Sequence, residues 1–177
     1  MLIIPGWLIA IVTFPGVIAH EIVHRLFADW AKVPVYKVCY FRVGNPVGYV
    51  IHGPVSSLKS SFLISVGPLI VNTLLCAIIT FSAVFPIYIL DAEQYSLVFP
   101  LLIWVGFSLG MNAFPSNDDM ESLVNNIKST KQGGILLLVV KLFAGLLRLA
   151  NALRVIWFDA IYALGVTMLL PWLFGFL

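Results

Sequence analysis

The stretch MLIIPGWLIAIVTFPGVIAHEIVH, residues 1–24, joins a membrane-type apolar run to a charged pentapeptide. Residues 1–19 carry no charged side chain, and residues 20–24 read His-Glu-Ile-Val-His. On a helix, His20 and His24 are one turn apart and project from the same face. Ionisable residues at membrane depth are costly to keep, so this stretch predicts a membrane helix with a functional site.

The pentapeptide has the pattern of a zinc site. Two imidazoles at this spacing can bind one zinc ion, and Glu21 between them can act as a general base on water. A third protein ligand is then required, with the fourth position left for water. The alternative is a pair of histidines that only form hydrogen bonds within a helix bundle.

The composition is that of a membrane protein with several spans. Of 177 residues, 61% are hydrophobic and 10% are charged, whereas a soluble domain is about half apolar and about a quarter charged. The net charge of +2 and the lack of a basic patch interleaved with aromatic residues argue against nucleic acid as a partner. Cys39 and Cys76 form neither a disulfide framework nor a CxxC pair, so we expect free thiols.

Apolar stretches define the expected fold class. Four are long enough to cross a bilayer, which takes about 20 residues, at 2–27, 61–90, 96–114 and 155–177. Gly6, Pro15 and Gly16 predict a kink in the first. We therefore expect an all-α polytopic membrane protein with about four transmembrane helices, an interfacial helix and a small β-hairpin after the first helix.

The hairpin and the interfacial helix occupy two further segments. Residues 33–55 are rich in β-branched and aromatic side chains, with a turn signal at Gly44-Asn45-Pro46. Residues 134–154 are long enough to span, but Lys141, Arg148 and Asn151 share one helical face. That stripe favours a helix lying in the interface over a fifth span.

The basic residues predict the orientation in the membrane. Arg25, Lys32, Lys37, Arg42 and Lys59 lie between the first two spans, and the next loop carries only the acidic Asp91 and Glu93. The positive-inside bias then places both termini outside and all ten basic residues on the cytoplasmic side, with Lys128, Lys131, Lys141, Arg148 and Arg154 completing the set.

This topology supplies a candidate third ligand. The first and third spans both run inward, so the histidines and the segment Asn112-Ala-Phe-Pro-Ser-Asn-Asp-Asp119 reach the same face of the membrane. Asp119 is the preferred third ligand and Asp118 the alternative. Ser116 and Asp119 also have the spacing of a helix capping box, which would explain Asp119 without a metal.

At this point the sequence resembles the site-2 protease family of intramembrane zinc metalloproteases. His-Glu-Ile-Val-His at 20–24, Gly-Pro-Leu-Ile-Val-Asn at 67–72 and Asn-Ala-Phe-Pro at 112–115 follow the family's order. The resemblance implies that His20 and His24 bind zinc, that Glu21 is the catalytic base, and that Asn72 and Asn112 engage substrate. The family's Asp-Gly is replaced by Asp118-Asp119-Met120.

The resemblance also implies a domain division and a function. Residues 1–125 would form the catalytic membrane core, and 126–177 would form the interfacial helix and the last span. We expect zinc-dependent hydrolysis of a peptide bond in or beside a transmembrane segment of a membrane-protein substrate, near the cytoplasmic face of the bilayer. The alternatives are a non-catalytic binding protein that keeps this fold, or a small metal or proton transporter. Glu121 is a weaker ligand candidate, and His52 is expected to be an ordinary surface histidine.

Overall fold

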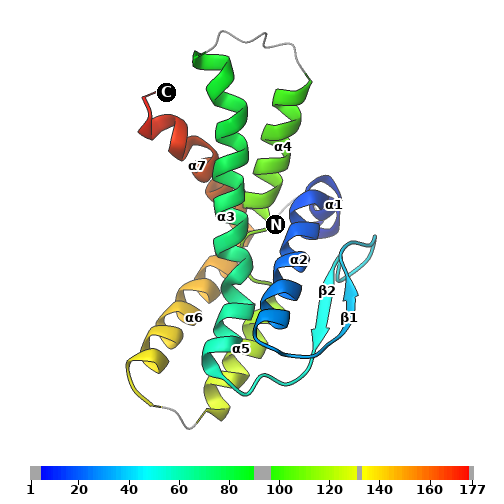
Figure 1. The fold of residues 1–177 in the computed structure, drawn as a ribbon, viewed down its shortest axis with the longest axis vertical. Coiled ribbons are helices and arrows are strands. Elements are labelled where there is room, and N and C mark those ends of the chain that lie inside the picture. The colour runs from blue at the N-terminus through cyan, green and yellow to red at the C-terminus, as the bar shows by residue number, and fades with distance from the viewer. Residues whose placement is uncertain (1–4, 90–96, 131–132, 176–177) are drawn as a thin grey trace.

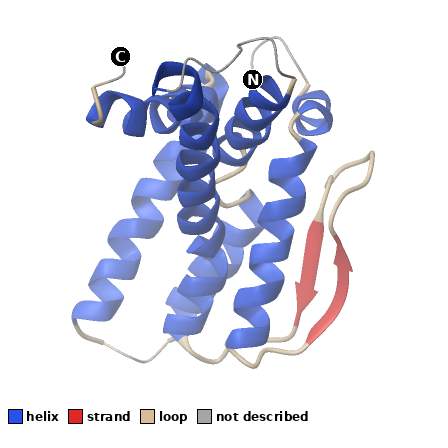
Figure 2. Ribbon diagram, turned by 45° about the horizontal axis from the view of Figure 1, so that its top comes forward, coloured by secondary structure: helices blue, strands red, loops and turns tan. Residues whose placement is uncertain are grey.

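The computed structural model describes residues 5–89, 97–130 and 133–175, which form helices and one two-stranded hairpin (Figure 2). The element bounds, in chain order, are α1 (Gly6–Val12), α2 (Phe14–Trp30), β1 (Val35–Cys39), β2 (Tyr49–His52), α3 (Leu58–Ile89), α4 (Val98–Met111), α5 (Asn117–Ser129), α6 (Ile135–Leu153), η1 (Arg154–Ile156) and α7 (Phe158–Leu173). The mainly helical class and the hairpin are confirmed. Asp91, Glu93 and Lys131 lie outside the described residues.

Helix α3 is the axis of the molecule. It has 32 residues, or about 48 Å at 1.5 Å per residue, and Figure 1 shows it running the length of the fold. Helices α4 and α7 lie beside its upper part, and α5 and α6 beside its lower part (Figure 1). Helix α3 is thus continuous through the middle of the molecule, whereas the chain beside it breaks between α4 and α5 and again between α6 and α7.

The first apolar stretch is also broken, as the prediction of a kink requires. Helices α1 and α2 meet at Thr13 with a bend of 91°. Pro15 lies in the first turn of α2, where the missing N–H costs no hydrogen bond within the helix. Gly16 then allows α2 to touch α4, because a Cβ atom at this position would lie 1.9 Å from the Ser108 carbonyl oxygen.

The predicted hairpin is confirmed, with β1 and β2 antiparallel and the Gly44-Asn45-Pro46 turn in their connection. It packs against α2, on the side where the helix carries Glu21, because Gly48 in the connection lies against that side chain. The hairpin therefore covers the part of α2 that carries the pentapeptide.

A buried apolar cluster joins α3, the α4–α5 connection, α5 and α6 in the lower half of the molecule. Its members are Leu58, Val66, Phe114, Met120, Leu123, Val140, Ala144, Leu147 and Ala150. The opposite face of α6 is apolar and exposed, with Leu138, Leu142, Leu146 and Leu149 on it. An exposed apolar face of this size is typical of a surface that contacts lipid or another protein.

The number of membrane-crossing helices differs from the prediction. Among the described residues, Leu58–Pro86 and Ile135–Ile156 are long and apolar enough to cross a membrane, and the bent α1–α2 pair would make a third. The predicted spans at 96–114 and 155–177 contain helices of only 14 and 16 residues, which reach about 21 and 24 Å against a hydrocarbon thickness of about 30 Å. Conversely, the 134–154 helix expected in the interface belongs to a stretch, Ile135–Ile156, that is long and apolar enough to cross a membrane.

Candidate metal centre

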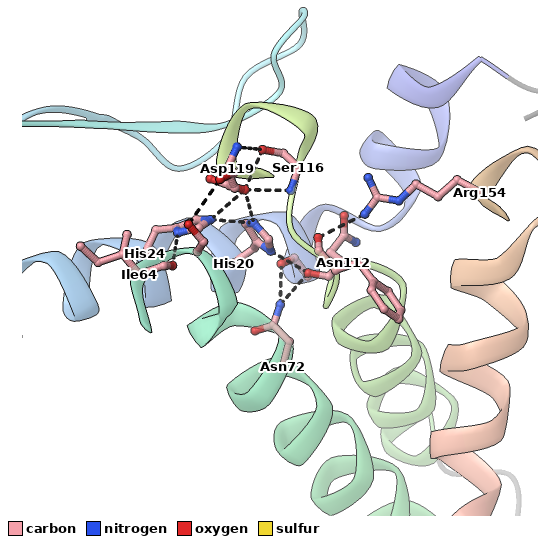
Figure 3. Close-up of polar contacts among 11 residues, drawn as sticks. His20, His24, Ile64, Asn72, Asn112, Ser116, Asp119 and Arg154 are labelled. Carbon is pink, nitrogen blue, oxygen red and sulfur yellow. Dashed lines mark hydrogen bonds and ion pairs between the residues drawn. The ribbon is translucent and has the colours of Figure 1, made fainter. Parts of the chain in front are cut away.

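Three potential metal ligands converge from two helices that are far apart in sequence. His20 and His24 lie on α2, and Asp119 lies in the first turn of α5. The Nε2 atoms of the two histidines are 2.9 Å apart. Asp119 Oδ2 is 3.3 Å from Nε2 of His24 and 3.8 Å from Nε2 of His20 (Figure 3). The expected juxtaposition of the pentapeptide with the Asp pair is therefore present, and Asp119 is the member that reaches the histidines.

Backbone carbonyls fix the orientation of both imidazoles. Nδ1 of His20 donates to the carbonyl oxygen of Asn112 at 2.8 Å, and Nδ1 of His24 donates to that of Ile64 at 2.9 Å. A carbonyl oxygen can only accept, so each Nδ1 carries the proton. The Nε2 atom of each ring is thereby turned toward the cluster, which is the arrangement that holds metal-binding histidines in place.

Neither carbonyl has a backbone partner within a helix, and the reason differs between the two. In a helix the carbonyl of residue 64 would pair with the N–H of residue 68, but residue 68 is proline, which has none. The carbonyl of Asn112 is free because α4 ends at Met111, and the last carbonyls of a helix have no partner within it. The proline of the Gly67-Pro68 pair thus has a definite effect: it leaves Ile64 available to His24.

The donor set fits a cation. Two Nε2 lone pairs and a carboxylate oxygen face one another, and without positive charge between them these electron-rich atoms would repel. Tetrahedral zinc with ligands at about 2.0–2.1 Å would hold them about 3.3 Å apart, and the observed separations of 2.9, 3.3 and 3.8 Å lie on both sides of that value. Two imidazoles and one carboxylate are also a known ligand set of catalytic zinc.

Asp119 is both the helix cap and the candidate ligand. Its Oδ2 accepts hydrogen bonds from the backbone N–H of Ser116 at 2.8 Å and from the Ser116 hydroxyl at 2.6 Å, which completes the predicted capping box. Burial raises the pKa of the Asp119 carboxyl, but the facing imidazoles of His24 and His20 lower it by more, so that this pKa stays well below its ordinary value. The cap therefore holds the carboxylate beside the histidines, and the capped oxygen Oδ2 is the same atom that faces their Nε2 atoms.

The other candidate ligands lie elsewhere. Asp118 and Glu121 are exposed on α5 and belong to no ligand cluster in the described part of the chain. His52 lies on β2, where its Nδ1 is 2.8 Å from the Gly53 carbonyl oxygen. These positions leave Asp119 as the carboxylate that joins the pair.

Glu21 is buried and lines a cavity of about 390 Å³ next to the histidines. The walls of this cavity include His20, Ser116 and the hairpin connection at 45–48. Glycine at position 48 lets the backbone approach Glu21 closely, because a Cβ atom there would come within 2.7 Å of Glu21 Cγ and 2.9 Å of its Oε1. The hairpin connection therefore closes directly over the predicted base.

Both predicted substrate-binding asparagines lie near the metal ligands, with their amide N–H groups already engaged. Nδ2 of Asn72 donates to the carbonyl oxygens of Asn112 and Gly16, at 3.0 and 3.4 Å. Nδ2 of Asn112 donates to the Thr13 hydroxyl at 2.9 Å and to the Ser108 carbonyl at 2.9 Å. Asn72 Oδ1 is buried and has no hydrogen-bond partner in the described residues. Substrate contact by either residue stays a prediction.

Sequence reasoning missed two charged residues of the cavity. The sequence assigns Arg154 only to the basic residues on the cytoplasmic side and gives Asp159 no role, but in the structure they form an ion pair of 2.9 Å, and both line the cavity that contains Glu21. The available signal was Asp159 itself, an acidic residue inside an apolar stretch that was long enough to span.

No family model matches this sequence, and no curated protein or solved structure is detectably similar to it. The resemblance to the site-2 protease family therefore depends on the three short motifs and on the order in which they occur.

Proposed function

We propose that this protein is a zinc-dependent endopeptidase of the membrane, which hydrolyses a peptide bond in or beside a transmembrane segment of its substrate. The observation that carries the proposal is the convergence of His20, His24 and Asp119 beside a cavity that contains Glu21. That combination of two imidazoles, a carboxylate and a free carboxylate base suits metal-assisted hydrolysis.

Each residue has a defined role in this proposal. His20, His24 and Asp119 would hold one zinc ion, which supplies a Lewis acid that polarises a peptide carbonyl and makes water more acidic. Glu21 accepts a proton from water in the cavity and returns it to the departing amine. Thr13 and the hairpin connection at 45–48 line the cavity that the substrate would enter.

The hairpin is the proposed docking element for that extended chain. The two described strands pair only with each other, so that each has an outer edge. An extended segment could add to such an edge through main-chain hydrogen bonds. A substrate helix has to unwind before this step, because its carbonyls are already paired.

The proposed setting is a multi-pass membrane protein with the metal centre near the cytoplasmic face. Basic residues at one end of the molecule support this orientation: Arg25 in the C-terminal half of α2, Lys59 at the start of α3 and Lys128 at the end of α5. Helix α5, which contributes Asp119, is amphipathic, with Met120 and Leu123 buried and its polar residues on the other face, as expected outside the hydrocarbon.

The proposal is tested with Glu21→Gln and the matched control Glu121→Gln, which changes an exposed glutamate of α5. Purified wild type and both variants are assayed for zinc content and for cleavage of fluorogenic single-span peptides in micelles. We expect about one zinc per chain in all three and cleavage by wild type and Glu121→Gln only. The Glu21→Gln variant should lose at least about 100-fold in rate, as for removal of a general base.

Two results would contradict the proposal. Zinc binding without cleavage of any peptide by wild type would favour a non-catalytic binding protein. Zinc flux into liposomes that survives Glu21→Gln would favour a transporter.

A further inference from the structure

The break between α6 and α7 is held in an unusual backbone conformation. Helix α6 ends in the 3₁₀ turn η1, and Trp157 follows with φ of 63° and ψ of 29°. This left-handed conformation is uncommon for a residue other than glycine and needs support from its surroundings. Five residues apart on a continuous helix, Arg154 and Asp159 would point about 140° away from each other. The break instead brings their side chains together.

Arg154 uses two sides of its guanidinium group. Its Nε donates to Asp159, at 2.9 Å from Oδ2 and 3.2 Å from Oδ1. Its Nη2 donates to the carbonyl oxygen of Phe114 at 3.1 Å (Figure 3). Asp159 is buried and Arg154 is partly buried. A charge pair in such a place is costly to desolvate and is weak evidence for stability.

The segment that Arg154 contacts supports two of the three metal ligands. At one end, the Asn112 carbonyl accepts from Nδ1 of His20. At the other end, the N–H and hydroxyl of Ser116 donate to Asp119 Oδ2. Phe114 lies between them, and its ring packs against Phe158 and Tyr162 of α7, with centroids 5.4 and 4.8 Å away. Residues 112–116 are thus fixed to the α6–α7 region by one ring and one guanidinium group.

We infer that Arg154 is a positioning residue of the metal centre, which acts by holding the 112–116 segment through the Phe114 carbonyl while Asp159 holds Arg154. This inference rests on the metal centre of the proposed function. It makes the C-terminal helices a part of the catalytic machinery, whereas the sequence had suggested a separate C-terminal part after residue 125. Lysine cannot replace Arg154 fully, because a single ammonium group lacks the planar fork that serves two acceptors.

The test compares Arg154→Gln and Arg154→Lys with the control Arg148→Gln. Arg148 is an exposed arginine of α6 and lines a different groove, so its loss removes the same charge without touching the 112–116 segment. Zinc affinity of the full-length protein is measured by competition with a chelator. Amide hydrogen exchange of residues 112–119 is measured in the zinc-free protein.

We expect Arg154→Gln and Arg154→Lys each to lose about tenfold in zinc affinity, as found for groups that orient metal ligands, and to exchange faster at 112–119. Arg148→Gln should match wild type in both measurements. The lysine variant keeps the charge beside Asp159, so its effect cannot be assigned to an unpaired buried carboxylate.

The outcomes separate this inference from the proposed function. Affinities of both Arg154 variants within twofold of wild type, with unchanged exchange, would overturn the positioning role and leave the proposed function standing. A wild type that binds zinc but cleaves nothing would overturn the endopeptidase, and the affinities would still decide the role of Arg154. A wild type that binds no zinc would overturn both.

Discussion

Helix α3 and the α4–α5 segment provide the same kind of support to the metal centre by different means. Each offers a backbone carbonyl to one imidazole, from Ile64 to His24 and from Asn112 to His20. Helix α3 is continuous past the centre and frees its carbonyl with Pro68. The other segment ends one helix, turns, and starts the next, so that it frees a carbonyl and also supplies Asp119.

The difference shows which support can come from a continuous helix and which requires one helix to end and another to begin. An orienting carbonyl needs only one missing N–H, which a proline provides inside an intact helix. A carboxylate directed at the histidines needs a new helix N-terminus, where a capping box holds an acidic side chain in place. The α4–α5 side should therefore be the more sensitive of the two to substitution.

The largest effect is expected at the carboxylate of the interrupted segment. Asp119→Asn keeps a side-chain oxygen for the cap but removes the charge, and we expect zinc affinity to fall by more than about 100-fold, beyond the range seen for supporting groups. Asp118→Asn, which changes its exposed neighbour, should bind zinc as wild type does. Equal affinities in a chelator competition would place the third ligand elsewhere.

A smaller effect is expected on the continuous helix. Pro68→Ala restores an N–H that competes with His24 for the Ile64 carbonyl, so the imidazole loses its fixed orientation. We expect zinc affinity to fall by about tenfold. The control is Pro86→Ala, at the other proline inside α3. Calorimetric titration measures the zinc affinity of both variants. Equal affinities of Pro68→Ala and Pro86→Ala would contradict the role of Pro68 in freeing the Ile64 carbonyl.

The smallest effect is expected from the cap alone. Ser116→Ala removes the hydroxyl that donates to Asp119 and accepts from its N–H, but leaves the carboxylate in place. We expect about 1 kcal/mol less stability in denaturant unfolding and a loss of zinc affinity below about tenfold. Ser122→Ala on the exposed side of α5 is the control. A loss of zinc affinity as large as that of Asp119→Asn would mean that Asp119 affects zinc binding through the cap and not as a ligand.

The sequence was informative wherever a local pattern determined the outcome. The pentapeptide predicted the facing imidazoles, the turn at Gly44-Asn45-Pro46 predicted the hairpin, and the Ser116–Asp119 spacing predicted the cap. The choice between Asp119 and Asp118 needed the structure, because it depends on where α5 begins relative to α2.

Features that depend on the packing of distant helices were not predictable. The Arg154–Asp159 pair requires a break in a stretch whose apolar pattern continues, and no turn residue marks the left-handed Trp157. The number of spans was overestimated because apolar residues flank α4 and α7 beyond the helices themselves. Composition fixes how apolar a stretch is, whereas tertiary contacts fix where its helix stops.

The ligand set of the metal is the central claim, and X-ray absorption at the zinc edge of the purified protein tests it most directly. The account predicts one zinc per chain with only nitrogen and oxygen ligands at about 2.0–2.2 Å, and an imidazole signal that is reduced in His20→Ala. A sulfur shell at about 2.3 Å, which Cys39 or Cys76 would provide, or a protein that retains no zinc, would contradict it.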